Sequence, residues 1–99
     1  SIGDGAAIGA NEAVKASGKA TPDFGIFAAD ATDEACDKIS KREEPFRASV
    51  SLGTPKQLAQ SVFDICMKLV NNEDIDSKIY RQFKVVNEEN VEDYMAGKI

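Results

Sequence analysis

The sequence predicts an α/β fold in which helices flank a parallel sheet. Helical stretches of roughly 10 to 17 residues alternate with short apolar strands, a spacing typical of parallel βαβ units. The predicted order is helix, strand, helix, strand, helix, strand, helix. The first strand is a run of six apolar or small residues between Asp23 and Asp30, as in a strand buried on both faces. The length of 99 residues suffices for one domain at most.

The first helix is predicted over residues 5–17, where alanine is frequent and helix propensity is therefore high. Asp4 stands where a helix-capping side chain is favoured. Gly18 follows the helix and suits a left-handed C-terminal cap. The sequence Thr21-Pro22-Asp23 then breaks the chain before the strand at residues 24–29.

The second helix is expected from about Thr32, because acidic residues fill its first turn and basic residues its last. Pro45 prevents the helix from continuing. Residues 46–50 then alternate between apolar and polar, which predicts a strand with one buried face. The helix is expected to bury Ala35, Cys36 and Ile39, and the strand Phe46, Ala48 and Val50.

The third helix, at residues 55–71, carries the strongest local signals. Thr54 and Gln57 have the spacing of a capping box, and Pro55 occupies the first helical position. A late strand at residues 79–86 and a short terminal helix capped by Asn87 complete the chain. The apolar face of the third helix comprises Leu58, Val62, Ile65, Cys66 and Leu69, and that of the last helix Val91, Tyr94 and Met95.

The composition argues against several functions. Lys and Arg number 12 and Asp and Glu 17, so the net charge of −5 disfavours a nucleic-acid backbone or an anionic membrane as main partner. The chain has no histidine, which excludes Ser-His-Asp and Cys-His catalysis, and its two cysteines are predicted to be buried thiols. No cofactor loop, metal-ligand cluster or nucleophile–base pair is predicted, so an enzyme is not expected. The acid pairs Glu43-Glu44 and Glu88-Glu89 are interpreted as solvated surface.

Ligands of open parallel sheets bind beyond the carboxyl ends of the strands, which selects three loops. Asp30 follows the first strand, and Ser51 and Gly53 follow the second. Gly3 and Asp4 lie just before the first helix, at the position where a strand leading into that helix would end. The carboxylates of Asp4 and Asp30 can accept hydrogen bonds from the hydroxyls of a polar ligand; the alternative for each is helix capping.

Several stretches together resemble one family, the type I periplasmic sugar-binding proteins. They are DGAAIGA at residues 4–10, FGIFAADAT at 24–32, FRASV at 46–50 and VVNEENV at 85–91. That family has two α/β lobes joined by a three-stranded hinge, with a sugar or similar polar solute held between the lobes. The resemblance implies that Asp4 and Asp30 face the cleft between the lobes and that Asp30 binds ligand hydroxyls.

Three positions depart from the family pattern, one of them Ala28, which stands before Ala29 and Asp30 where the family has glycine. Gly3 stands where the family usually has asparagine, and Ser51, Leu52 and Gly53 replace its usual glutamine. The changes at Gly3 and at residues 51–53 each remove a polar ligand contact, so the resemblance implies a solute other than a simple pentose or hexose, or a loss of binding.

The resemblance covers the C-terminal third of the family's length. Residues 1–53 would then be part of the C-terminal lobe, and residues 54–99 would supply a helix, a hinge-crossing strand and the terminal helix. We therefore expect a fragment whose fold depends on the missing N-terminal lobe, on another chain or on self-association.

The function implied is the solute-binding component of an ABC sugar transporter or chemosensory system. Such a protein works outside the cytoplasm, in the periplasm or as a cell-surface lipoprotein whose signal peptide is removed, and serves membrane transporter or sensor subunits. The alternative is the effector-binding domain of a lactose-repressor-type transcription regulator. That alternative is weaker, because such regulators usually carry T-V-x-Q-P where residues 49–53 are SVSLG.

Overall fold

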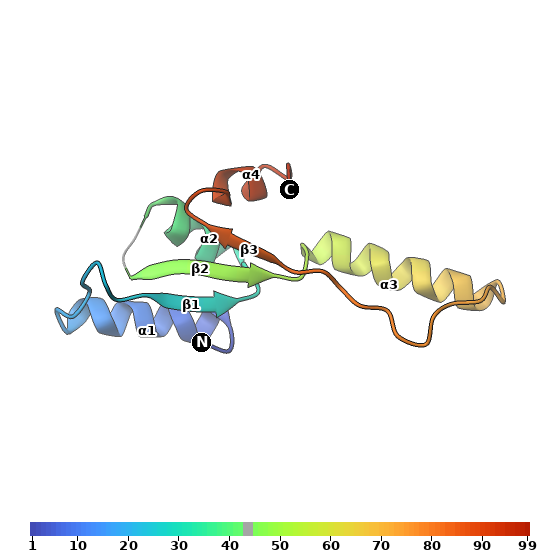
Figure 1. The fold of residues 1–99 in the computed structure, drawn as a ribbon, viewed down its shortest axis with the longest axis horizontal. Helices are drawn as coiled ribbons and strands as arrows, with labels where there is room; N and C mark the ends of the chain where they lie inside the picture. The colour runs from blue at the N-terminus through green and yellow to red at the C-terminus, as the bar shows by residue number, and fades with distance from the viewer. Residues whose placement is uncertain (43–44) are drawn as a thin grey trace. The chain divides into compact units, whose positions relative to one another are not determined.

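The computed structural model describes residues 1–42 and 45–99, which form two compact units. The first unit combines Ser1–Ser51 with Val85–Ile99, and the second is Leu52–Lys84. Glu43 and Glu44, predicted to be solvated surface, lie outside the described residues. The elements follow the predicted order (Figure 1): α1 (Asp4–Ala16), β1 (Ile26–Ala29), α2 (Asp33–Ser40), β2 (Phe46–Ser51), α3 (Pro55–Val70), β3 (Lys84–Asn87) and α4 (Val91–Met95).

A three-stranded sheet in the order β1-β2-β3 organises the first unit. β1 and β2 are parallel, as predicted. The predicted α/β class with flanking helices is confirmed, and the parallel pairing is that of β1 with β2, since β3 is drawn running against β2 (Figure 1). The late strand is also shorter than residues 79–86, since only Lys84–Asn87 is a strand.

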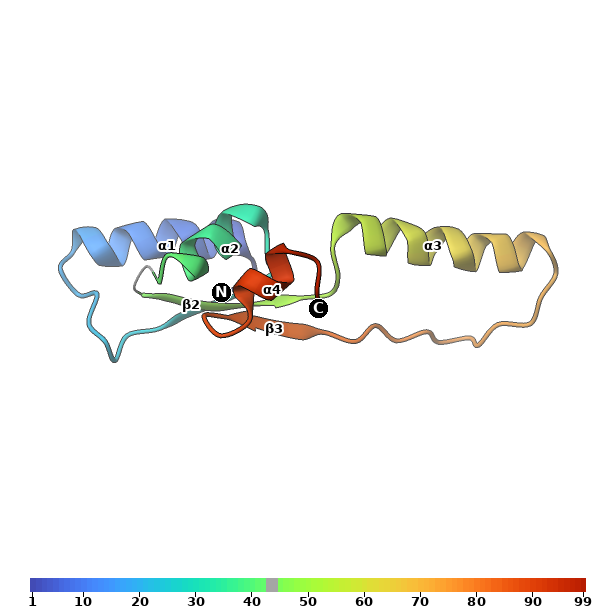
Figure 2. The ribbon, with the colours of Figure 1, turned by 90° about the horizontal axis from the view of Figure 1, so that it is seen from above.

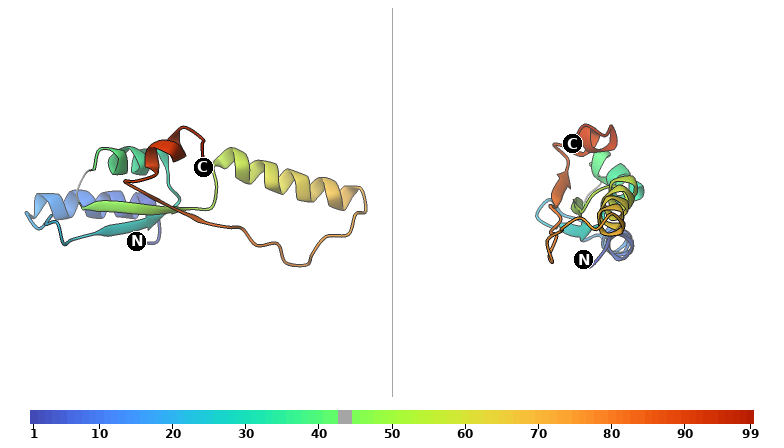
Figure 3. Two further views of the ribbon diagram at one scale, coloured as in Figure 1. Left: turned by 45° about the horizontal axis from the view of Figure 1, so that its top comes forward. Right: turned by 90° about the vertical axis from the view of Figure 1, so that its right-hand side faces the viewer.

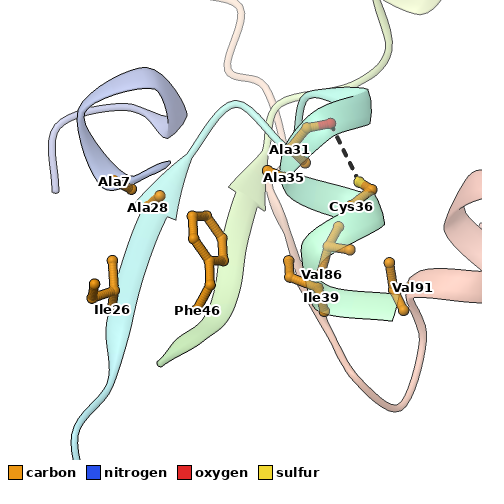
Figure 4. Packing of buried hydrophobic residues seen from close by; sticks show 10 residues of the cluster. All are labelled: Ala7, Ile26, Ala28, Ala31, Ala35, Cys36, Ile39, Phe46, Val86 and Val91. Carbon is orange, nitrogen blue, oxygen red and sulfur yellow. Dashed lines mark hydrogen bonds between the residues drawn. The ribbon is translucent and has the colours of Figure 1, made fainter. Parts of the chain in front are cut away.

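Helices α1 and α2 cover one face of the sheet (Figure 2). The core on that face joins Phe46 of β2 to Ile39 of α2, Val86 of β3 and Val91 of α4 (Figure 4). Burying such apolar side chains stabilises the fold by about 1.5–3 kcal/mol each. The predicted burial of Ala35, Cys36 and Ile39 is confirmed.

The face of the sheet that lies away from α1 and α2 is partly exposed, contrary to the prediction for β1. β1 was expected to be buried on both sides, yet the side chain of Phe27 is 60% exposed. A register shift between Ile26 and Phe27 pairs Phe27 with Ala48 and Ala28 with Ser49. Because Ala28 belongs to the core under the helices, Ser49 faces those helices too, while Phe27 and Ala48 face the other side. The predicted burial of Phe46 and Ala48 is confirmed, but the irregularity breaks the alternation later in β2, where Ser49 is buried and Val50 only half-buried.

The helix ends test the predicted caps. Gly3, not Asp4, is the N-cap of α1, and it makes no side-chain cap bond. Gly18 follows α1 with a φ of 73°, the left-handed conformation expected of it. Asn90 rather than Asn87 is the N-cap of α4, because the Asn87 side chain accepts a bond from Glu89 N–H within the preceding turn.

The second unit consists of α3 and the chain that returns along it. The predicted capping box is present: Gln57 N–H donates to Thr54 Oγ1 at 3.2 Å and Thr54 N–H to Gln57 Oε1 at 2.9 Å. The prediction of a buried Cys66 thiol is wrong, since Cys66 is exposed and no residue of α3 is buried. Apolar periodicity indicates which face of a helix is apolar, and much of that face of α3 is exposed to solvent. None of the helices in the described residues has both the length and the hydropathy needed to cross a bilayer.

Candidate functional site

Asp30 occupies the position at which β1 ends. Its N–H donates to Val50 O at 2.7 Å, which fixes its backbone to the end of β2. Its side chain is exposed. Its φ is 110° and that of the following Ala31 is 50°, and both values are unusual for residues with a side chain. Such conformations cost about 1–3 kcal/mol each and are concentrated at ligand sites, where surrounding structure enforces them.

The surrounding structure here is a carboxylate clamp, which we define as Asp4, Thr32 and Ser49. Asp4 is 1% exposed, and its Oδ2 accepts from Thr32 N–H at 2.6 Å and from Thr32 Oγ1 at 2.9 Å. Its other oxygen, Oδ1, accepts from Ser49 Oγ at 2.6 Å. Ser49 Oγ also accepts from Ala31 N–H at 2.9 Å. These bonds hold the loop directly after Asp30, so Asp4 supports the site from the interior.

The clamp also settles the capping alternatives. Asp4 does not cap α1, and the N-cap of α2 is Thr32, whose Oγ1 accepts from Ala35 N–H at 3.4 Å. Asp30 is therefore not the cap of α2, and its side chain is exposed at the carboxyl end of the strand.

Gly3 lies next to Asp30. A Cβ atom at Gly3 would be 3.3 Å from Asp30 Oδ2, which is closer than most such contacts. Because Gly3 has no side chain, the Asp30 carboxylate can occupy the space beside its Cα atom. Gly3, Asp4 and Asp30, which the sequence placed at the same edge of the sheet, are brought together by these contacts.

Ser51 and Gly53 are placed differently. Ser51 is 1% exposed, and its hydroxyl lies 2.7 Å from Tyr94 Oη, which ties the end of β2 to α4. Gly53 belongs to the second unit, where its φ of 117° requires glycine. A Cβ atom at Gly53 would lie 3.3 Å from Gln57 Oε1 and 3.7 Å from Arg81 Nη2.

Sequence reasoning missed Ser49, Thr32 as an Asp4 partner, and Tyr94. Ser49 was assigned to the polar face of β2, and only its position between two apolar strand residues gave a signal. The bond from Ser49 to Asp4 spans 45 residues, so no local spacing could reveal it.

Cys36 lies on the interior side of the same loop. Its Sγ donates to Ala31 O at 3.5 Å (Figure 4). Burial, followed by the negative charges of Asp4 and Asp33, raises the pKa of Cys36 to about 11. The group is therefore a neutral thiol at neutral pH, without the thiolate that nucleophilic chemistry needs.

The chemistry available at this edge is hydrogen-bond acceptance by one exposed carboxylate on a constrained loop. Within residues 1–42 and 45–99, no three His, Cys, Asp or Glu side chains gather in a way that would hold a metal ion. A hollow of about 470 Å³ lies elsewhere in the first unit, lined by residues that include Phe27, Arg47 and Val85 but none of the five predicted site residues.

Comparison with known proteins identifies the fold of the chain. No family model and no curated protein matches the sequence. A solved structure does match: an ABC transporter solute-binding protein from Agrobacterium vitis with bound allitol, at a TM-score of 0.83 and 18% identity. The match covers 97% of this chain and 32% of that one, so the chain spans about a third of the solved protein's length. The chain thus has the mixed α/β fold of part of a solute-binding protein.

Proposed function

We propose that this chain is part of a solute-binding protein that holds a sugar or polyol between two lobes. The observation that carries the proposal is Asp30: an exposed carboxylate at the carboxyl end of β1, on a strained loop held by the carboxylate clamp. The similarity to a solute-binding protein with bound allitol supports a polyhydroxylated ligand.

In this proposal Asp30 accepts hydrogen bonds from ligand hydroxyls. Bonds to a charged acceptor contribute roughly 1.5–3 kcal/mol each, enough to select a polyol over an apolar solute. Asp4 positions the loop through Thr32 and Ser49, and the missing side chain of Gly3 lets the Asp30 carboxylate take its place beside the backbone of Gly3. Ser51 ends β2 and Gly53 follows two residues later, and each would meet the ligand through its backbone rather than through a long polar side chain.

The proposed mechanism is closure of two lobes around the solute, with no covalent step. Residues 1–53 would belong to the C-terminal lobe, and residues 54–99 would supply a helix, a hinge-crossing strand and the terminal helix. The N-terminal lobe would come from the rest of a longer polypeptide or from another chain. Such a protein would work outside the cytoplasm and deliver its solute to the membrane subunits of a transporter or sensor.

A thermal-shift screen of the longer protein tests the proposal. We expect at least one linear polyol or sugar, with allitol among those tried, to raise the melting temperature in a dose-dependent way. Asp30→Ala should abolish most of that shift, whereas Asp23→Ala, which removes an exposed carboxylate in the turn before β1, should preserve it. A screen in which no polyol or sugar raises the melting temperature overturns the proposal.

A further inference from the structure

The backbone of Asp30 is hydrogen-bonded to the end of β2, at a residue that stands between two serines. Asp30 N–H donates to Val50 O at 2.7 Å, and Val50 is flanked by Ser49 and Ser51. Alternate residues of a strand point to the same face, and both serines are 1% exposed. Because a buried hydroxyl group requires a hydrogen-bond partner, the partners of these two serines determine how firmly Val50 O is held.

Each serine is bonded to a different helix of the first unit. Ser49 Oγ donates to Asp4 Oδ1 of α1 at 2.6 Å, within the carboxylate clamp. Ser51 Oγ shares a hydrogen bond of 2.7 Å with Tyr94 Oη of α4. The two bonds span 45 and 43 residues, so the end of β2 is held by helices that are distant from it in sequence, in opposite directions.

Tyr94 is itself held in place by the contacts of α4. It is half-buried against the core, one turn after Val91, which is 1% exposed. Just before α4, the side chain of Asn90 donates to Val85 O at 2.9 Å and accepts from Asn87 N–H at 2.9 Å. α4 also packs against α2 (Figure 3). A helix of five residues is not stable alone, so these contacts fix the position of the tyrosine hydroxyl.

We propose that Tyr94 is a positioning residue for solute binding, which acts through Ser51 and Val50 on the backbone of Asp30. This inference rests on the proposed function, in which Asp30 binds ligand hydroxyls. The carboxylate clamp holds the loop that follows Asp30, whereas Tyr94 holds the strand end to which Asp30 is bonded. A site that already has its binding geometry loses less conformational entropy when the solute arrives, and therefore binds more tightly.

Two variants that remove the same hydrogen bond test this role by calorimetric titration of the longer protein. The titrant is allitol, or whichever polyol stabilises the protein most in the screen. Tyr94→Phe and Ser51→Ala should each weaken binding roughly 3- to 10-fold, because Asp30 is then less well positioned. The double variant should bind no more weakly than Tyr94→Phe, since all three variants lose one and the same bond. Tyr80→Phe, which removes a hydroxyl from a side chain that is 82% exposed, is the control and should bind as the parent does.

Site-resolved hydrogen exchange distinguishes positioning from a general loss of stability. The Asp30 amide, bonded to Val50 O, should exchange about fivefold faster in Tyr94→Phe than in the parent. The Ile26 amide, bonded to Pro45 O at the other end of β1, should change by less than about twofold. Equal acceleration of both amides would show only a loss of global stability and would overturn the inference.

Two results of the titration would also overturn it. One is an unchanged affinity of Tyr94→Phe, and the other is a pair of single-variant losses that multiply in the double variant. The exchange measurement keeps the inference separate from the proposed function. If the parent binds no polyol, the proposed function fails, and the exchange rates of the two amides decide whether Tyr94 positions the backbone of Asp30.

Discussion

Ser49 Oγ donates a hydrogen bond to Asp4 Oδ1 at 2.6 Å, joining the middle of β2 to the first residue of α1. Both groups are 1% exposed, and the same carboxylate also receives two bonds from Thr32. The loop that carries Asp30 is therefore held from beneath by a buried carboxylate. A charged group that is buried and fully hydrogen-bonded is costly to disturb, which makes Asp4 the first residue to test.

Asp4→Asn should destabilise the protein although it preserves the shape of the side chain. Asparagine has an amide nitrogen in place of one carboxylate oxygen. That nitrogen is a hydrogen-bond donor, and it would face Thr32 or Ser49 groups that themselves donate to Asp4. We expect the free energy of unfolding to fall by about 2–4 kcal/mol, measured by urea denaturation of the longer protein. Asp23→Asn, at an exposed turn, is the control and should change it by less than about 0.5 kcal/mol. Equal midpoints for Asp4→Asn and the parent protein would contradict the role of the clamp.

Asp30→Gly should raise stability and weaken binding together. Glycine adopts a φ of 110° without the cost that a side chain incurs, so we expect a gain of about 1 kcal/mol. The same substitution removes the carboxylate proposed to bind ligand hydroxyls. The measurements are the melting temperature without ligand and the shift caused by the polyol. A lower melting temperature than the parent would show that the Asp30 side chain stabilises the loop, contrary to the strain we describe.

The buried thiol of Cys36 predicts a specific alkaline dependence of stability. Its pKa is raised from 9.0 to about 11 in the folded state, so between these pH values the folded protein binds more protons than the unfolded chain. Stability should therefore fall as the pH rises from 9 to 11. Other groups titrate in this range, so the quantity to measure is the difference between the parent and Cys36→Ala. That difference should decrease in this interval; a constant difference from pH 8 to pH 11 would contradict the assignment.

The exposed apolar residues of α3, which include Phe63 and Val70 outside the predicted stripe, predict association of the isolated 99-residue chain. Val62 is 58% exposed, Phe63 59% and Val70 72%. Large apolar side chains exposed on one element favour association. Phe63→Lys should shift the sedimentation profile of the isolated chain toward the monomer, whereas Gln60→Lys, which adds the same charge at a polar position, should not. A parent chain that sediments as a monomer at all concentrations would contradict this prediction.

The sequence-based expectations succeed where a short stretch of chain decides the structure. The capping box of Thr54 and Gln57, the end of α1 at Gly18 and the order of the elements all follow from local propensity and spacing. They fail where partners distant in sequence decide. Asp4 has the spacing of a cap, yet Thr32 and Ser49 draw its carboxylate into the interior.

Burial was the other source of error. Phe27 and Cys66 were expected to be buried, but the described chain offers nothing that covers them fully. Periodicity shows which face is apolar and does not show whether a partner is present. For Asp30 the sequence predicted the place in the fold, while its unusual φ and its exposed side chain came only from the structure.

A calorimetric titration of the longer protein with the polyol that stabilises it most tests the central claim directly. Asp30→Asn keeps the shape of the side chain and tolerates a positive φ, so it isolates the loss of the charged acceptor. We predict that it weakens binding roughly 10- to 150-fold, which corresponds to one charged hydrogen bond, while Asp23→Asn binds as the parent does. Equal affinity of Asp30→Asn and the parent would show that Asp30 takes no part in binding the solute.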